Sequence, residues 1–420
     1  MSEYILKKKF LEQKDESTER PRRQHHIVVG DFLRLPVFFY NTLGIAPYET
    51  DRTPSLWFNL YFVLIMSNAT LNGTLEFVYT WMCFRQNDIF EGCIMCGYCA
   101  FTVTGMLKIV AVAMQKKRLT TLVKSLESCF PPSDKREQEQ YSVKSYLKRC
   151  DLFSKGFAGL FLIMYFIHSL TAIIIYAYRI LVLRLPDVEE SLPFFDLEPW
   201  NWQGSWRYYM SYVAQSIGGY TATVGNFAAD LMIFGVVFQV TMYFEGLSRA
   251  LREFRIRNGS EVDGARKDLE ELRSLIAYHI KILRLTELMN AVFGATLLLN
   301  FMVSSWLVCL LGFQLTIEFS PEHFAKQVLM LVSAQLEIYL LCYFSQMLIN
   351  ASEDVRLAVY EMDWTEADPR FRKMLILLAM RAGRPICIKA TVMLNVEIET
   401  MSIFLQMSYK FFCAIRMMYQ

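Results

Sequence analysis

The sequence predicts an all-α membrane protein with seven transmembrane helices, its amino terminus in the cytoplasm and its carboxyl terminus outside the cell. Three observations lead to this prediction: the apolar composition, the length of the apolar runs, and the placement of Lys and Arg between them. Hydrophobic residues make up 54% of the 420 residues, and charged residues only 20%. This balance is too apolar for an ordinary soluble protein of this length.

Seven apolar runs are long enough to cross a membrane, since a helix needs about 20 residues to span a hydrocarbon core of about 30 Å. They lie at 55–82, 88–114, 153–181, 208–240, 286–314, 325–349 and 388–416. Each run is continuous rather than alternating, which argues against a membrane β-barrel. The first run is interrupted by Asn68, Asn72 and Glu76, and the last by Glu397 and Glu399. These two runs are therefore the least apolar of the set.

Basic residues set the direction of the helices. The segments 1–54, 115–155, 246–285 and 350–385 together hold 34 Lys and Arg. The intervening loops hold three, namely Arg85, Arg184 and Arg207. Because cytoplasmic loops carry the excess of Lys and Arg, the amino terminus is expected inside the cell.

This direction is opposite to that of G-protein-coupled receptors. Their Asp-Arg-Tyr sequence does not follow the third run, and their Asn-Pro-x-x-Tyr sequence does not occur in the seventh. We therefore expect a protein that requires no G protein. The chain divides into a cytoplasmic segment over 1–54, helices one to six over 55–349, a cytoplasmic segment over 350–387 and the last helix over 388–420.

Parts of the cytoplasmic segments are also predicted to be helical. Residues 264–290 place Leu269, Leu272 and Ile276 close to helical spacing, and charged residues fill the other face. Residues 115–128 can continue the second run into the cytoplasm. We expect these helices to form a cytoplasmic layer that packs within or between subunits, or alternatively to lie on the membrane surface.

Several ionisable residues fall inside the apolar runs, where a charge is costly and is expected to face a partner, water or a pore. They are Glu76, Lys108, Asp230, Glu337, Glu397 and Glu399. Enzyme chemistry has little support. Cys93, Cys96 and Cys99 have a metal-like spacing but lie inside one run without a second ligand cluster, so packing thiols are the simpler interpretation. We expect no catalytic residues, no metal, no cofactor and no nucleic-acid partner.

The carboxyl-terminal part of the chain carries the most specific sequence patterns. Tyr360 and Trp364 precede Met380-Arg381-Ala382-Gly383-Arg384-Pro385, and Ser408-Tyr409-Lys410-Phe411-Phe412 follows in the last run. Together they resemble the tail of insect odorant receptors. Gustatory receptors carry a Thr-Tyr followed by Gln-Phe, whereas this chain has Ser408-Tyr409 and then Arg416-Met417. The shared odorant co-receptor is longer and has a larger second cytoplasmic segment, so the chain is similar to an odorant-specific tuning subunit.

The resemblance implies a ligand-gated, non-selective cation channel. Its subunits form a tetramer in the plasma membrane of olfactory neuron dendrites, in contact with membrane lipid. The tuning subunit assembles with the co-receptor, the segment 355–384 helps to anchor the subunits, and the last helix lines a central pore. A gustatory-type homotetrameric channel is the first alternative. A transporter is the second, although the odd number of helices and the lack of an internal repeat argue against it.

The resemblance also places a volatile ligand between helices two, three, four and six. The candidates at those positions are Met95, Tyr98, Cys99, His168, Ala172, Tyr176, Tyr212, Gln215, Ile217, Met330 and Ser333. His168 is the most specific of these candidates, although a hydrogen bond to a neighbouring helix would also explain a histidine at this depth in the membrane. In the last helix, Glu397 and Glu399 are candidates for attracting cations, and Ala414 and Met418 for forming the hydrophobic gate.

Overall fold

The structure is a computed structural model that describes residues 26–49, 54–132, 134–184, 190–257, 262–317, 321–391 and 394–419. The chain enters through two short helices, α2 (Val29–Phe32) and α3 (Arg34–Thr42). The long helices are α4 (Leu56–Arg85), α5 (Ile89–Met114), α8 (Val143–Leu181), α9 (Arg207–Arg252), α10 (Val262–Ile317), α11 (Pro321–Glu361) and α13 (Ile398–Tyr419). Between them lie α6 (Lys116–Cys129), α7 (Lys135–Gln140), α12 (Pro369–Ala382) and the strands β1 (Ile388–Lys389) and β2 (Asn395–Val396).

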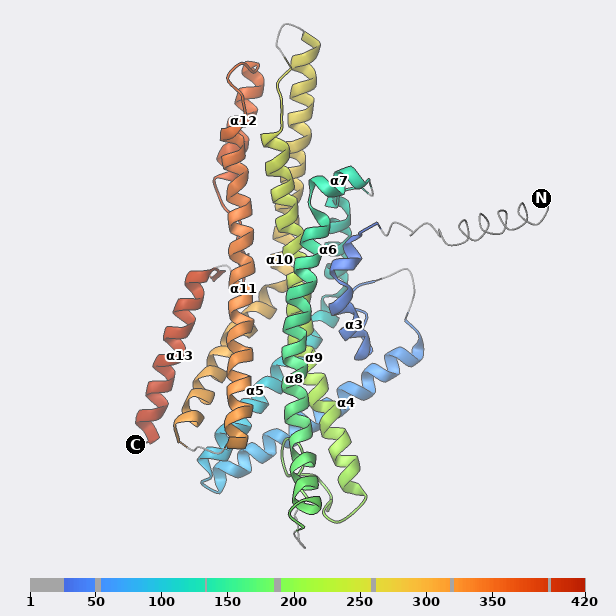
Figure 1. The fold of residues 1–420 in the computed structure, drawn as a ribbon, viewed down its shortest axis with the longest axis vertical. Helices are drawn as coiled ribbons and strands as arrows, with labels where there is room; N and C mark the ends of the chain where they lie inside the picture. The colour runs from blue at the N-terminus through green and yellow to red at the C-terminus, as the bar shows by residue number, and fades with distance from the viewer. Residues whose placement is uncertain are drawn as a thin grey trace, which may run out of the picture.

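Helix α9 is the centre of the bundle. It contacts α4, α5, α8, α10 and α11, and every residue from 221 to 244 is buried. A helix that is apolar on all sides must be covered on all sides, which explains why these five long helices surround it. In Figure 1, α8 to α11 run along the long axis of the molecule, while α4 and α5 cross it obliquely.

Among the described residues, five helices are long and apolar enough to cross a membrane by length and composition: α5, α8, α9, α10 and α11. These confirm five of the predicted runs. Helices α4 and α13 are not among the five, although they have 30 and 22 residues. They correspond to the two runs that polar and acidic side chains interrupt.

Several helices extend well past the predicted membrane segments. The amphipathic helix expected over 264–290 is the first half of α10, which continues without a break into the membrane run. Helix α8 begins at Val143, and α11 continues to Glu361. In Figure 1 these extensions stand upright at one end of the bundle together with α12. This arrangement favours a packed layer over helices that lie flat on a membrane surface.

An ion-pair cluster fastens two of these extensions together. Arg252, at the end of α9, donates two hydrogen bonds to the Asp354 carboxylate on α11, at 2.7 and 2.8 Å, and a third to Glu361. The guanidinium lowers the pKa of the Asp354 carboxyl below its ordinary value. Because all three side chains are about one third exposed or more, the cluster contributes orientation more than stability.

The last helix begins later than the sequence predicts. Residues from 388 were expected to start the seventh span, but Ile388 and Lys389 pair instead with Val396 and Asn395 in an antiparallel hairpin. The reason is tertiary: the Ile388 amide donates to Ser345 on α11, and the Asn290 side chain on α10 bonds the backbone of Cys387 and Lys389. These bonds hold the segment extended, so α13 starts at Ile398.

Candidate ligand-binding cavity

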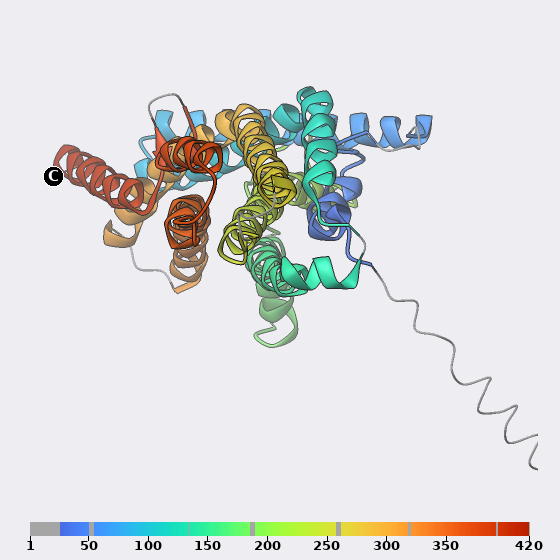
Figure 2. The same ribbon diagram turned by 90° about the horizontal axis from the view of Figure 1, so that it is seen from above.

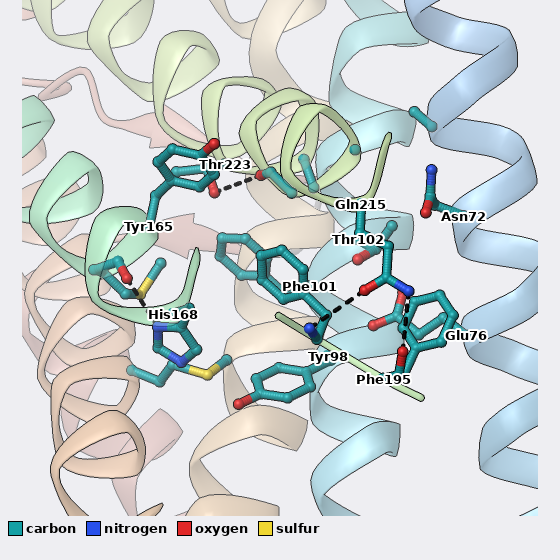
Figure 3. Close-up of a pocket in the computed structure, with 17 residues that line it drawn as sticks. Asn72, Glu76, Tyr98, Phe101, Thr102, Tyr165, His168, Phe195, Gln215 and Thr223 are labelled. Atoms are coloured by element: carbon teal, nitrogen blue, oxygen red, sulfur yellow. Dashed lines mark hydrogen bonds between the residues drawn. The ribbon is translucent and has the colours of Figure 1, made fainter. Parts of the chain in front are cut away.

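A cavity lies within the helix bundle, between α4, α5, α8, α9 and α11, and the loop before α9 covers it (Figure 3). Its lining residues are Ala69, Asn72, Glu76, Tyr98, Phe101, Thr102, Met164, Tyr165, His168, Phe194, Phe195, Gln215, Gly218, Gly219, Ala222, Thr223 and Met330. The lining is mostly apolar and aromatic with a few polar groups. That is the usual character of a small-molecule site.

The cavity is small in this conformation. Its volume is about 50 Å³, which is room for a few water molecules. Met164 on α8 and Met330 on α11 both line it. Methionine side chains are unbranched and rotate readily, so these two residues can widen the cavity without a shift of the backbone.

The loop between α8 and α9 forms the cover of the cavity. Phe194 and Phe195 come from this loop, and Gln215 on α9 holds it in place. The Gln215 amide nitrogen donates to the Phe195 carbonyl at 3.0 Å, and its oxygen accepts from the Phe194 amide at 3.4 Å. Gln215 therefore borders the cavity, but its polar atoms are occupied by the loop.

His168 is buried at the wall that α8 contributes. Its Nδ1 lies 2.8 Å from the Met164 carbonyl oxygen one turn earlier. Its Nε2 is buried and has no hydrogen-bond partner in the described part of the chain. The ring meets Tyr98 of α5 edge-on, with centroids 5.7 Å apart, and the two side chains face the same hollow in Figure 3.

Four of the eleven predicted ligand residues line the cavity: Tyr98, His168, Gln215 and Met330. Ser333 is close by, because its hydroxyl bonds the Met330 carbonyl at 2.8 Å and approaches the Met164 sulfur at 3.4 Å.

The other six predicted residues lie away from the cavity. Met95 packs against Phe195 beneath the loop, and Cys99 faces Thr80 on α4 at 3.4 Å. Ala172 and Tyr176 lie one and two turns further along α8 than His168, and the Tyr176 ring packs 6.3 Å from that of Tyr208. The Tyr212 hydroxyl donates to the Ser169 carbonyl, and Ile217 is 37% exposed on the outer face of α9.

The sequence reasoning missed two sources of lining residues. The first helix contributes Ala69, Asn72 and Glu76, and the covering loop contributes Phe194 and Phe195. Asn72 and Glu76 were visible as polar residues in an apolar run, which indicated that they face the protein. Nothing in the spacing of the loop indicates that it folds inward.

A cluster of buried charges lies deeper in the bundle, next to the cavity. The Lys108 ammonium on α5 lies 3.0 Å from Asp230 of α9 and 3.1 Å from Glu337 of α11, and it also donates to the Asn226 carbonyl at 2.9 Å. The Asn300 amide of α10 donates to the other Asp230 oxygen at 2.7 Å. The prediction that these ionisable groups face partners is confirmed, and the partners are one another.

The candidate pore residues lie on or just before α13. Glu399 is exposed in its first turn, Glu397 is half-buried just before it, and Ala414 is exposed near its end. The side chain of Met418 lies outside the described residues. Figure 2 places α13 at the edge of the bundle, where it contacts α10 and α11.

Within the described part of the chain, no group of three or more His, Cys, Asp or Glu is arranged to hold a metal ion. Cys93, Cys96 and Cys99 are free thiols on one helix. Cys93 packs with Leu310 and Phe313 of α10, so the metal-like spacing serves packing.

Comparison with known proteins gives one consistent result. Residues 93–409 match the family described as 7tm Odorant receptor. Odorant receptor 67a of Drosophila melanogaster is 53% identical over 97% of this chain and 100% of its own length, and Odorant receptor 85c of the same organism is 33% identical over 92% and 99%. The solved olfactory receptor OR5 of Machilis hrabei in complex with eugenol has a TM-score of 0.78 at 15% identity, covering 93% of this chain and 98% of its own.

Proposed function

The chain belongs to the insect odorant receptor family, and from this premise we propose that it is the odorant-binding tuning subunit of a heteromeric, ligand-gated, non-selective cation channel. It is a multi-pass membrane protein and, as a member of a receptor family, not an enzyme. Its expected place is the dendrite membrane of an olfactory sensory neuron, with the amino terminus in the cytoplasm, where the 34 Lys and Arg of the basic segments lie.

The observation that carries this proposal is the covered, mostly apolar cavity in the helix bundle. A volatile molecule is small and apolar, and it loses little by leaving water for such a site. The OR5 structure is a complex with eugenol, which supports a small organic ligand here. Tyr98, His168 and Met330 are the predicted ligand residues that we propose to touch it, together with Phe101 and Phe194.

We propose that α13 lines the channel pore. One side of this helix packs on α10 and α11, and beside that contact Ile403, Met407 and Phe411 border a groove shared with α10 and are exposed in the single chain. A tetramer that includes the co-receptor would cover that apolar side around a central axis, and the residues near Ala414 would close it by dewetting. Ala414 is small, so the co-receptor would supply most of the seal.

The cytoplasmic layer is suited to holding the subunits together. Tyr360, Trp364 and Ile376 border a groove between α11 and α12 and are exposed in the single chain. Large exposed apolar patches commonly mark protein interfaces. We propose that this groove packs against a neighbouring subunit, as part of the anchor expected over 355–384.

Whole-cell recording tests the proposed function. Three sets of cells express the chain alone, the chain with the co-receptor, or the co-receptor alone. Each set is exposed to the same odorant panel. We expect odorant-specific currents only when both proteins are present. Robust currents from the chain alone would indicate a homomeric channel of the gustatory type, and uptake of a substrate without current would indicate a transporter.

The two carboxylates at the start of α13 give a further prediction. If at least one faces permeating ions, replacing both by Glu397→Gln and Glu399→Gln lowers the local cation concentration. We expect calcium permeability relative to sodium to fall by about twofold, measured from reversal potentials.

The matched control is Glu353→Gln, an exposed carboxylate on α11. Unchanged conductance and permeability in the double variant would contradict this prediction. Glu399 would then serve to stabilise the positive, amino-terminal end of the helix dipole.

A further inference from the structure

We infer that the cavity selects odorants that carry a hydroxyl group on an apolar body, and that the Nε2 atom of His168 accepts the hydrogen bond from that hydroxyl. The inference rests on the proposed function, because it takes the cavity as the odorant site. It adds the chemical class of the ligand and the atom that recognises it.

The tautomer of His168 follows from its one hydrogen bond. Nδ1 lies 2.8 Å from the carbonyl oxygen of Met164, and a carbonyl oxygen only accepts hydrogen bonds. Nδ1 therefore carries the proton and donates it. In a neutral ring the other nitrogen, Nε2, is then unprotonated and presents a lone pair. A charged ring would add a second buried donor and an unpaired charge to an apolar site, which is strongly unfavourable.

The Nε2 lone pair has no hydrogen-bond partner among the residues that the structure describes. Only 5% of the residue is exposed, and Nε2 is a buried atom without a hydrogen bond. Among the described residues, His168 is the one cavity-lining side chain that has such an atom. A buried polar atom that is left unpaired is unfavourable, so a ligand that supplies the missing donor gains affinity.

Three polar side chains of the cavity wall already have hydrogen-bond partners in the protein. The Tyr165 hydroxyl donates to the Ser216 carbonyl at 3.1 Å, and the Thr223 hydroxyl donates to the Gly219 carbonyl at 2.8 Å. Gln215 holds the covering loop. None of these bonds has to break if the new hydrogen bond forms at His168.

The surroundings of Nε2 fit an apolar ligand body. Tyr98 meets the histidine ring edge-on, and Phe101 and Met330 line the same cavity. A ligand oxygen that only accepts, as in an ether, would set its lone pairs against the lone pair of Nε2. The site therefore distinguishes a hydroxyl from an ether or a methyl group of similar size.

The experiment uses the full chain co-expressed with the co-receptor. Matched probes differ only in hydroxyl against methyl: para-ethylphenol and para-ethyltoluene, cyclohexylmethanol and ethylcyclohexane, hexanol and heptane. Methyl ethers of the three hydroxyl compounds form the third set. The readout is the concentration that gives half-maximal current, for the parent protein and for the variants His168→Phe and His168→Gln.

We expect the parent protein to respond to at least one hydroxyl compound at a concentration about tenfold to a hundredfold lower than to its methyl partner and its ether. His168→Phe keeps a flat ring but removes the acceptor, so in this variant the half-maximal concentrations of each hydroxyl compound and its methyl partner should agree within about threefold. His168→Gln retains an acceptor oxygen and should keep part of the preference.

Three results would overturn the inference. Equal sensitivity of the parent protein to hydroxyl and methyl partners removes the selectivity itself. A preference that persists in His168→Phe assigns it to another group. In both cases the proposed function survives, because the channel still opens to odorants. If the parent protein, co-expressed with the co-receptor, gives no current in response to any probe or to a broad odorant panel, the proposed function is overturned together with the inference.

Discussion

Replacing Lys108 by methionine is expected to prevent most of the protein from reaching the cell surface. Lys108 is fully buried, and its ammonium is the cation that faces both Asp230 and Glu337, at 3.0 and 3.1 Å. The variant Lys108→Met keeps the unbranched side chain and removes the charge, which leaves two buried carboxylates side by side. Removing one partner of a buried ion pair costs about 3–5 kcal/mol, a large share of the stability of a typical domain.

Surface labelling and thermal aggregation of the detergent-solubilised protein measure this effect. The triple variant Lys108→Met, Asp230→Asn and Glu337→Gln removes all three charges, and it should recover most of the loss because a neutral buried cluster has no unpaired charge. Lys155→Met is the matched control, since Lys155 is 65% exposed and its ion pair is with Asp151 one turn away. Normal surface levels of Lys108→Met would show that the carboxylates do not depend on this cation.

The charged cluster shows how far the sequence could lead. A charge in an apolar run is costly, and this alone predicted that Lys108, Asp230 and Glu337, like three other acidic residues, face a partner, water or a pore. Which groups meet depends on the offset between helices that lie 122 and 229 residues apart in the chain. The spacing of residues within one helix does not determine that offset between helices. The pairing of the charges could therefore be identified only from the three-dimensional structure.

The cavity was predictable to a similar degree. Length and apolarity predicted the helices, and the family resemblance predicted which of them surround the ligand. On α8 the predicted residues and the cavity lie at different depths. The candidates Ala172 and Tyr176 extend outward from His168, whereas the lining continues inward to Met164 and Tyr165. The hairpin before α13 was missed for a related reason. Its extended backbone is held by Asn290 and Ser345, which are distant in sequence.

The close contact between α5 and α9 gives the second large prediction. Gly105 and Gly225 lie where these helices touch, and a Cβ atom on Gly105 would come within 2.3 Å of the Ala222 carbonyl oxygen. A Cβ on Gly225 would come within 2.4 Å of the Gly105 carbonyl oxygen. Both obstacles are backbone atoms, which cannot rotate away. Each of Gly105→Ala and Gly225→Ala must therefore push the two helices apart, at a cost of about 1–3 kcal/mol or more.

Pushing the helices apart also affects ligand recognition, because Phe101 and Thr102 on α5 and Ala222 and Thr223 on α9 line the cavity. We expect either variant to lower surface expression several-fold, and to raise the half-maximal odorant concentration of the protein that does reach the surface by about tenfold or more. Gly156→Ala on α8 is the matched control, since its Cβ would have no atom within 4 Å. A helix interior gains about 0.5–1 kcal/mol from that change. If Gly105→Ala behaved like Gly156→Ala in expression and dose response, α5 and α9 would not be in backbone contact, and the wall of the cavity that they share would have to be redrawn.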